Sequence, residues 1–285
     1  MNVFNAPDFF ILGAPKCGTT SLSNALSRHP DIYIPSIKEV GFFSNEENWE
    51  KGIEWYESHF DLSNSESLVG EATPHYLHAP KAPQRIARVC PEARLIAMVR
   101  DPVERARSHY WFRRWHGTES RPLRRAFEEE LERFPAWDEV DYLLPPGCYV
   151  KHLNRYTEHF GRDRLFVLPL SKLSFSPQDA LSEVQRFLGI PSYPLSLSKD
   201  NRSRAPRSHT YRDFVQYWVK SQGVTKRLLK QVTTRSFRRW LKDLIHSVNM
   251  KDKKKTPIPG DIKRRLEELY RPRKKKLREK FGVKV

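Results

Sequence analysis

The sequence is poor in cysteine and has no long apolar segment. Its three cysteines, Cys17, Cys90 and Cys148, show neither metal-ligand spacing nor the pairing of a disulfide framework. No apolar run reaches the roughly 18 residues of a membrane span, and residues 1–8 lack the basic and apolar regions of a signal peptide. No acidic pair has the pattern of a magnesium site. We therefore expect a cytoplasmic protein without a metal ion.

Acidic residues are scarce in only one part of the chain. Residues 207–285 hold 25 Lys and Arg against 7 Asp and Glu, whereas residues 1–206 hold 26 against 27. The net charge of +17 therefore comes from the last part of the chain. The 285 residues, 38% of them hydrophobic, suffice for one sizeable core. We predict a core over 1–206 and a basic helical C-terminal extension over 207–285, packed on or next to that core within a single domain.

A glycine-bounded loop follows the first apolar run of the chain. Residues 9–12 predict a buried strand, and Gly13-Ala-Pro-Lys-Cys-Gly-Thr-Thr-Ser21 then leads into a helix. Free N–H groups and the helix dipole attract anions there, so the segment is a candidate phosphate cradle. A nucleotide-hydrolysing loop would carry its lysine where Thr19 stands. Here the lysine is Lys16, which disfavours an ordinary ATPase or kinase.

Arg100 marks a second candidate phosphate site. The apolar residues 95–99 predict a strand that ends at Arg100, and Asp101-Pro102 suits the start of a helix. Arginine makes charge-assisted, bidentate contacts with phosphate, and Ser108 lies eight residues further along. The carboxyl ends of parallel strands share one edge of a sheet, so we expect the two motifs to converge.

Predicted strands and helices alternate along the chain, which favours βαβ units and a parallel sheet. Strands are expected at 8–12, 68–70, 94–99 and 164–169, with a short extended piece at 32–34. Helices are expected at 19–28, 49–59, 80–90, 102–114, 123–134, 149–160, 177–188 and 261–281. The predicted fold is α/β, P-loop-like and three-layered, with a central parallel β-sheet flanked by helices and a basic helical C-terminal region.

These motifs resemble those of the sulfotransferases that use 3′-phosphoadenosine 5′-phosphosulfate (PAPS). Residues 13–21 resemble their 5′-phosphosulfate loop, and residues 95–108 resemble the segment with their 3′-phosphate clamp. The bacterial and heparan-sulfate-type (Golgi carbohydrate) branch is matched further by residues 37–43, 51–56, 70–76 and 147–149. Ala72 stands where heparan-type members often carry a substrate-side lysine, so the resemblance does not extend to heparan sulfate as the acceptor.

The resemblance implies PAPS as the sulfuryl donor, adenosine 3′,5′-bisphosphate as the product and no metal. It assigns nucleotide binding to Ala14, Pro15, Lys16, Cys17, Gly18, Thr19, Thr20, Ser21, Arg100, Ser108, Tyr149, Arg202, Ser203 and Arg204. Lys16 would stabilise charge on the leaving phosphate during in-line transfer. A helix N-terminus can activate a thiol, but Cys17 is better explained as a small residue that fills a tight loop.

An acceptor hydroxyl needs a general base, and Glu39 matches the base of the heparan-type branch. Its apolar neighbours Val40 and Phe42 are expected to bury it in part, which would raise its pKa. Glu71, at the end of a predicted strand, is the competing carboxylate and could instead orient the substrate. Candidate substrate-binding residues are Lys38, Phe43, Glu71 and His75. Lys38 has the alternative of pairing with Glu39.

The extension 207–285 combines cations with apolar stripes. Trp218, Phe237 and Trp240 recur with aliphatic residues at helical spacing, and Lys and Arg fill the gaps. Such helices suit peripheral contact with an anionic membrane, here at its inner face, or with another polyanion. The alternative is that the stripes pack on the core and the cations are solvated. No specific nucleic acid is expected as a partner.

Three functions compete at this point. A sulfotransferase that moves the sulfuryl group from PAPS to a hydroxyl of a carbohydrate or glycolipid explains both phosphate motifs. A nucleotide or small-molecule kinase with a variant P-loop does not explain Arg100 and Ser108. A basic membrane- or polyanion-binding module explains only the extension. We therefore expect a PAPS-dependent sulfotransferase with Lys16 and Glu39 as its catalytic residues.

Overall fold

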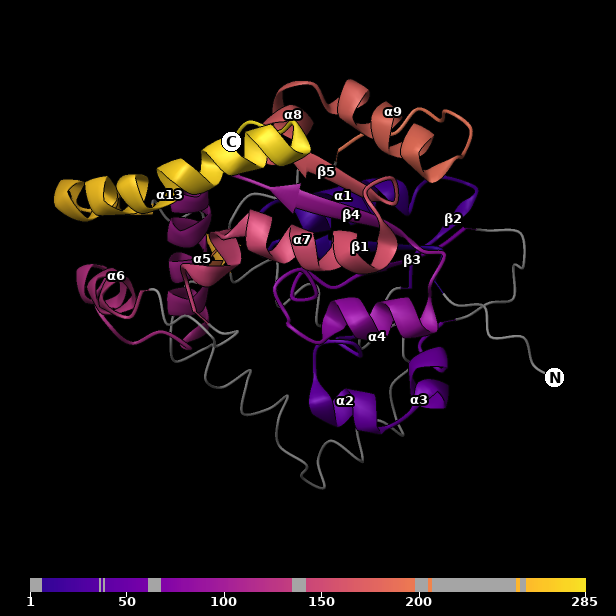
Figure 1. Cartoon of the computed structure of the whole chain (residues 1–285), viewed down its shortest axis with the longest axis horizontal. Coiled ribbons are helices and arrows are strands. Elements are labelled where there is room, and N and C mark those ends of the chain that lie inside the picture. Colours follow the sequence, from indigo (N-terminus) through magenta and orange to yellow (C-terminus); the bar gives the residue numbers. More distant parts are fainter. Residues whose placement is uncertain are drawn as a thin grey trace. The chain divides into compact units, whose positions relative to one another are not determined.

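The main sheet of the computed structural model is parallel throughout. The structure describes residues 7–35, 37, 39–60, 68–134, 142–197, 205–206, 250–251 and 255–285. Five strands lie in the order β2-β3-β1-β4-β5 (Figure 1). They are β1 (Phe9–Gly13), β2 (Ile32–Tyr33), β3 (Leu68–Ala72), β4 (Arg94–Val99) and β5 (Leu165–Pro169). Helices supply the crossovers that parallel neighbours need, which confirms the predicted fold class.

The central strand β1 is buried on both faces. The side chains of Phe9 to Leu12 are fully shielded from solvent, as expected for a parallel strand that helices cover on both sides. Gly70 on β3 lies opposite Phe9, and a Cβ at that position would come within 2.2 Å of the Phe9 ring. The glycine therefore makes room for the aromatic side chain in the core.

Helices flank the sheet, and most of them begin and end near the predicted positions. Their bounds are α1 (Thr19–Leu26), α2 (Glu46–Glu50), α3 (Ile53–Glu57), α4 (Ala82–Val89), α5 (Pro102–His116), α6 (Leu123–Glu132), α7 (Tyr149–Phe160), α8 (Leu170–Phe175), α9 (Pro177–Leu188) and α13 (Gly260–Phe281). A 3₁₀ turn over Pro145–Gly147 precedes α7. The predicted bounds of α7 and α9 are confirmed without change.

One local prediction was wrong, and one short helix was not predicted. The single helix expected over 49–59 is two short helices, because Gly52 with φ 81 interrupts the chain between α2 and α3. The short helix α8 directly follows β5 and was not expected. Its six residues are too few to show a helical period in the sequence.

The chain forms two compact units. One comprises residues 1–109, 122–201 and 257–285, and the other comprises residues 110–121 and 202–256. In the second unit, Ala205–Pro206 (β6) and Met250–Lys251 (β7) form an antiparallel pair. The amphipathic helices predicted across 207–249 lie outside the described residues. No helix in the described part of the chain is long and apolar enough to cross a membrane.

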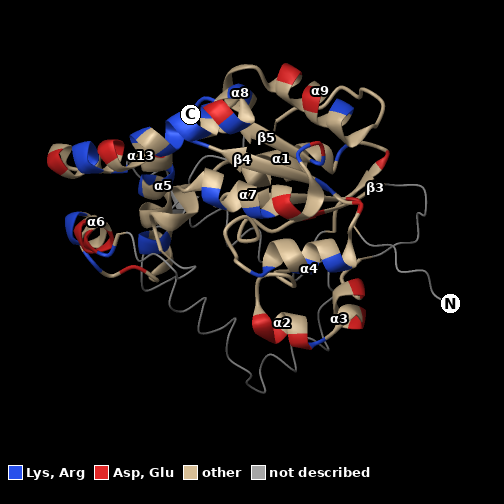
Figure 2. Cartoon of the chain, in the orientation of Figure 1, with Lys and Arg blue, Asp and Glu red and all other residues tan. Residues whose placement is uncertain are grey.

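Helix α13 belongs to the first unit, together with the sheet, and packs against α6 and α7. It buries one stripe at helical spacing, made of Ile262, Leu266, Tyr270, Leu277 and Phe281. Its cations gather in the second half of the helix, from Arg271 to Lys280 (Figure 2). The amphipathic pattern predicted over 261–281 is therefore used to attach this helix to the core.

Candidate functional site

The predicted phosphate loop begins where β1 ends, at the carboxyl edge of the sheet. Gly13 has φ 132, and a Cβ there would lie 2.2 Å from the carbonyl oxygen of Pro74, so only glycine fits. The N–H of Ala14 donates to the carbonyl of Met98 on β4 at 2.8 Å. Gly18, with φ 88, immediately precedes α1. The loop therefore turns directly into a helix N-terminus, where anions bind.

Lys16 lies in the middle of this loop and is half-buried. Its φ of 69 is uncommon for a residue with a side chain, and such conformations cluster at functional sites. Burial lowers the pKa of Lys16, the charge of Glu39 acts in the opposite direction, and the charge of Arg100 lowers it further. A bound anion would favour the charged form of Lys16, so the position suits a phosphate or sulfate group.

Cys17, the next residue, is fully buried. Its sulfur lies 3.6 Å from the hydroxyl of Tyr149. Burial raises the pKa of the Cys17 thiol, while the charge of Arg105 and the contact with Tyr149 act in the opposite direction. A buried thiol with a raised pKa is a poor nucleophile, so Cys17 serves to pack the loop.

The second phosphate motif meets the first at Arg100. The Tyr149 hydroxyl donates to the Arg100 carbonyl at 2.8 Å and accepts from the Arg100 N–H at 3.3 Å. Nη1 of Arg100 lies 3.5 Å from the carbonyl oxygen of Lys16, and its Nη2 lies 3.7 Å from the carboxylate of Glu104. The structure thus brings Lys16, Arg100 and Tyr149 together, as their motifs predict.

The other described residues that are predicted to bind the nucleotide lie in the phosphate loop, on α1 and on α5. In the loop and the first turn of α1, Ala14, Pro15 and Thr19 are buried, Ser21 is half-buried and Thr20 is exposed. Ser108 is buried on α5. Arg202, Ser203 and Arg204 lie outside the described residues. The contacts of all these residues with a nucleotide stay predictions.

Glu39 is exposed and has φ 57. The expectation that its apolar neighbours bury it was wrong, because Val40 and Phe42 pack into the core without it. Its charge nevertheless acts on the pKa of Lys16, so its carboxylate lies near the phosphate loop. An exposed carboxylate at that place is accessible to an incoming acceptor.

Glu71, the competing carboxylate, lies in the core. It accepts hydrogen bonds from the hydroxyls of Tyr56 at 2.5 Å and Thr73 at 2.6 Å. Burial raises the pKa of Glu71, and the hydrogen bonds from Thr73 and Tyr56 act in the opposite direction. The Thr73 hydroxyl also accepts the N–H of Gly41 at 3.4 Å. Glu71 therefore supports the segment that carries Glu39, and its burial argues against the predicted direct contact with an acceptor.

The other predicted acceptor contacts differ in exposure. Phe43 is fully buried and packs edge-to-face on Phe10 and Tyr76, with ring centroids 5.7 and 5.5 Å away. This burial argues against direct contact between Phe43 and an acceptor. His75 is exposed and stays a candidate. Lys38 lies outside the described residues.

Similarity to known proteins covers almost the whole chain. A family model described as "Sulfotransferase domain" matches residues 6–273. The chain belongs to the sulfotransferase family. Sulfotransferases of this family take the sulfuryl group from PAPS, and the loop of Lys16 next to Arg100 fits such a donor because it offers cations at two neighbouring anion positions.

Two curated relatives and one solved structure illustrate what this chain is similar to. It is 35% identical over 204 residues to the "Bifunctional heparan sulfate N-deacetylase/N-sulfotransferase 4" of Mus musculus, covering 67% of this chain and 23% of the relative. It is 39% identical over 162 residues to the "Membrane-associated sulfotransferase kil1" of Dictyostelium discoideum, covering 54% and 32%. The chain thus spans less than a third of the length of these relatives. The crystal structure of a sulfotransferase from Alicyclobacillus acidocaldarius matches with a TM-score of 0.70 and 25% identity, covering 98% of this chain and 97% of that one.

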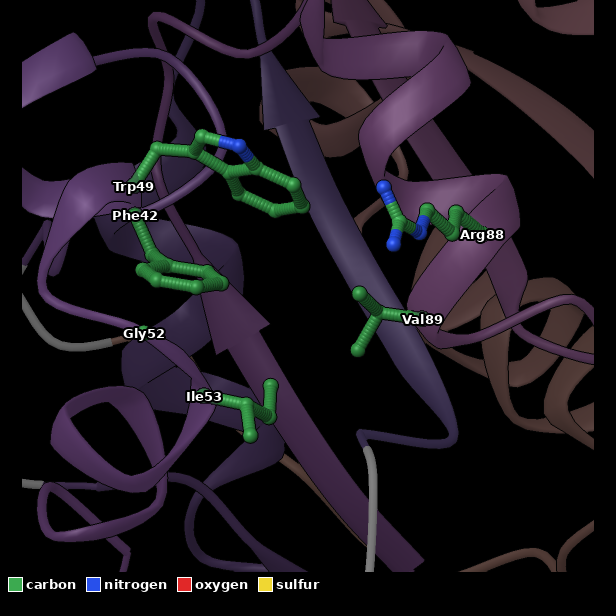
Figure 3. A pocket seen from close by; sticks show the side chains of 6 residues that line it. All are labelled: Phe42, Trp49, Gly52, Ile53, Arg88 and Val89. Carbon is green, nitrogen blue, oxygen red and sulfur yellow. The ribbon is translucent and has the colours of Figure 1, made fainter.

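The chain also has a separate pocket of about 380 Å³ among α2, α3 and α4 (Figure 3). Its lining consists of Phe42, Trp49, Gly52, Ile53, Arg88 and Val89. The side chains of Trp49 and Arg88 lie on opposite sides of it (Figure 3). None of the predicted site residues lines this pocket, so the phosphate loop does not depend on it.

Sequence reasoning missed one buried cation close to the site. Arg105 on α5 is fully buried, and its charge acts on the pKa of both Cys17 and Tyr149. The sequence did contain a signal, since Arg105 stands among Val103, Ala106 and other residues that the helix buries. Among the described residues, no group of three or more His, Cys, Asp or Glu could hold a metal ion.

Proposed function

We propose that the chain transfers a sulfuryl group from PAPS to a hydroxyl of a carbohydrate or glycolipid. One observation carries the proposal. Two phosphate motifs, 84 residues apart in sequence, meet where Arg100 reaches the carbonyl of Lys16. PAPS carries anionic groups at its 5′ and 3′ positions, so its site needs two neighbouring cationic positions. The loop of Lys16 would hold the 5′-phosphosulfate, and Arg100 with Ser108 would hold the 3′-phosphate.

The transfer step exchanges one oxygen on sulfur for another. The acceptor oxygen bonds to sulfur while the bond between sulfur and the phosphate oxygen breaks, which releases adenosine 3′,5′-bisphosphate. The acceptor proton passes to Glu39, and Lys16 offsets the charge that grows on the departing phosphate. The charge of Glu39 opposes the downward shift of the Lys16 pKa, and this electrostatic interaction supports the arrangement.

A carbohydrate acceptor is supported by the relatives, whose printed names include heparan sulfate N-sulfotransferase. Those names also make a sugar amine the competing acceptor. Labelled PAPS offered with sugar alcohols, amino sugars and glycolipids tests the proposal. Transfer to a hydroxyl supports it, and transfer to amines alone contradicts the hydroxyl assignment while leaving the donor site intact.

Ligand-dependent thermal stability tests the donor assignment. Adenosine 3′,5′-bisphosphate at about 100 times its Kd should add about 2.7 kcal/mol to the free energy of unfolding. AMP, ATP and duplex DNA at the same concentration should stabilise the chain less. Stronger stabilisation by ATP would favour the variant P-loop kinase, and stronger stabilisation by DNA would favour a polyanion-binding module.

Two matched carboxylate variants test the general base. Glu39→Gln should keep affinity for the nucleotide and reduce turnover by about 10²–10⁴-fold, the usual contribution of a general base. Glu71→Gln should reduce stability, because Glu71 accepts two buried hydrogen bonds. Normal transfer by Glu39→Gln, with inactive but folded Glu71→Gln, would reverse the two assignments.

The extension 207–285 is proposed to bind an anionic surface, with the enzyme at the cytoplasmic face of a membrane. The support is its excess of 25 basic over 7 acidic residues, each cation near an anionic bilayer being worth about 1 kcal/mol. Charge reversal at Arg235, Arg238, Arg239 and Lys242 should weaken salt-sensitive binding to anionic vesicles and leave nucleotide affinity unchanged. If anionic vesicles bind no protein at low salt, the alternative holds that the cations of the extension are only solvated.

A further inference from the structure

The α7 entry segment, residues 142–148, is held by buried polar side chains from other helices. The N–H groups of Leu143 and Leu144 both donate to the carboxylate of Glu130 on α6, each at 2.8 Å. The buried guanidinium of Arg105 on α5 donates to the carbonyl of Leu143. This charged group lies in the core with only part of its donor capacity used. Breaking such contacts is costly, so the position of the segment is strongly fixed.

Helix α13 contacts the same segment through Tyr270. The Tyr270 hydroxyl donates to the carbonyl of Leu144 at 2.6 Å. A Cβ on Gly147 would lie 3.0 Å from both the Tyr270 oxygen and the Cβ of Pro102, the first residue of α5. The segment, α5 and α13 therefore meet without spare volume, and a change at Tyr270 alters the position of the segment.

The entry segment ends directly before Tyr149, which holds the peptide groups next to Arg100. The Tyr149 hydroxyl contacts both the carbonyl and the N–H of Arg100, at 2.8 and 3.3 Å. A displaced entry segment would therefore displace the backbone of Arg100. Among the described residues, the guanidinium of Arg100 has contacts at 3.5 and 3.7 Å, which are longer than those of its backbone, so we expect its direction to depend on the backbone that carries it.

Helix α13 also contacts the residue that follows Arg100. Nζ of Lys274 lies 2.8 Å from one carboxylate oxygen of Asp101. The other carboxylate oxygen caps α5 by accepting the N–H groups of Val103 and Glu104, both at 3.0 Å. Burial raises the pKa of Asp101, but the hydrogen bonds from Lys274 and the helix N–H groups outweigh it, so the net shift is downward. Lys274 thus helps to keep a charged cap at the junction that carries Arg100.

We propose that α13 is a positioning element of the 3′-phosphate site. Tyr270 acts through the entry segment and Tyr149, and Lys274 acts through the Asp101 cap. Both orient Arg100 toward the 3′-phosphate without contact to the nucleotide themselves. The inference rests on the proposed function, because it requires that Arg100 binds the 3′-phosphate of the donor.

Nucleotide selectivity in the full chain tests this role. Tyr270→Phe removes one hydroxyl, and Lys274→Gln removes the positive charge that pairs with Asp101. Kd is measured calorimetrically for adenosine 3′,5′-bisphosphate and for AMP, which lacks the 3′-phosphate. Each variant should bind adenosine 3′,5′-bisphosphate about 5- to 20-fold more weakly, near or below the low end of the roughly 10- to 150-fold effect of a lost hydrogen bond to a charged group. AMP affinity should stay unchanged, so the Kd for AMP divided by the Kd for adenosine 3′,5′-bisphosphate should fall.

Lys275→Gln is the matched control, since Lys275 is exposed one residue away and pairs with Glu279 at 3.8 Å. It should keep the selectivity of the unmodified chain. If Lys274→Gln keeps the same nucleotide selectivity as Lys275→Gln, the proposed role of Lys274 is overturned. Lys274 is half-exposed, so we expect Lys274→Gln to fold and to keep the proposal testable even if Tyr270→Phe does not fold. The double variant Lys274→Gln with Arg100→Ala should bind adenosine 3′,5′-bisphosphate no more weakly than Arg100→Ala alone. If the unmodified chain itself does not distinguish the two nucleotides, the donor assignment fails instead.

Discussion

The phosphate loop and the α7 entry segment, which supports Arg100 through Tyr149, are fixed by different means. The phosphate loop is shaped by its own glycines and by a backbone hydrogen bond to β4 next to it. The α7 entry segment is held by side chains from α5, α6, α7 and α13, and its partner Tyr270 lies 126 residues further along the chain. The first geometry depends on glycines within the loop and on backbone groups of neighbouring segments, and the second depends on side chains from distant helices.

This difference decides how each region responds to change. A substitution in the phosphate loop acts directly on residues that are proposed to contact the donor. A substitution around the entry segment reaches Arg100 only through Tyr149 or Asp101. We therefore expect large effects on chemistry from the loop and smaller, selective effects on 3′-phosphate recognition from the distant helices.

The largest effect is expected for Lys16→Ala. Lys16 is proposed to offset the charge that grows on the leaving phosphate, so its removal should lower kcat by about 10³-fold, as for other groups that stabilise a developing anion. Adenosine 3′,5′-bisphosphate should still bind through Arg100. Single-turnover rates with labelled PAPS measure the change. A variant with normal kcat and a raised KM would show that Lys16 binds the donor without favouring the transition state.

Gly13→Ala tests whether the loop needs a glycine at its first position. A Cβ at Gly13 would lie 2.2 Å from a backbone oxygen of Pro74, at a φ of 132 that side chains avoid. The backbone strain and overlap should lower the free energy of unfolding by about 3 kcal/mol. Gly161→Ala is the control, because its added Cβ meets nothing within 4 Å although its φ of 75 is also positive. Urea unfolding of both variants separates the overlap from the strain, and equal losses would contradict the overlap.

Arg100→Ala should have a smaller effect, confined to binding. The lost charge-assisted contact should weaken adenosine 3′,5′-bisphosphate by about 2 kcal/mol, with little change for AMP. Calorimetric titration of both nucleotides measures the difference. Equal weakening of the two would mean that Arg100 acts on the 5′ group through its contact with Lys16.

The same contrast explains what the sequence could predict. The loop from Gly13 to Ser21 is contiguous, so strand, turn and helix start are all visible in one segment, and Arg100 follows its strand in the same way. The support of Glu39 by Glu71 was not visible, because it passes through Thr73 and Gly41 on different segments. The burial of Glu71 and Phe43 was missed for a similar reason. A position next to a motif does not show whether a side chain faces the site or the core.

The role of α13 also escaped sequence reasoning. Its apolar spacing predicted a helix correctly, but only the fold shows that Tyr270 reaches Leu144 and that Lys274 reaches Asp101. The basic character of the extension suggested one shared purpose for residues 207–285. The described part of that extension shows that at least α13 packs with the core.

The smallest expected effect is a loss of stability at acidic pH that arises from a histidine next to the α7 entry segment. Nε2 of His152 on α7 lies 2.8 Å from the carbonyl oxygen of Pro145. Burial lowers the pKa of His152 to about 4, opposed in part by that hydrogen bond. Its folded pKa therefore lies below the ordinary value of about 6.5, so the unfolded chain binds more protons between these values and stability falls as the pH drops. From pH 7 to 5.5 the loss should be about 1 kcal/mol.

Urea midpoints at the two pH values measure this slope, and His152→Gln should reduce it because glutamine does not titrate. The phosphate loop contains no histidine, so the loss should be the same in Lys16→Ala as in the unmodified chain. An unchanged slope in His152→Gln would assign the acid sensitivity to another group. If stability no longer depends on pH in His152→Gln, the acid sensitivity arises from the packing around α7 and not from the phosphate loop.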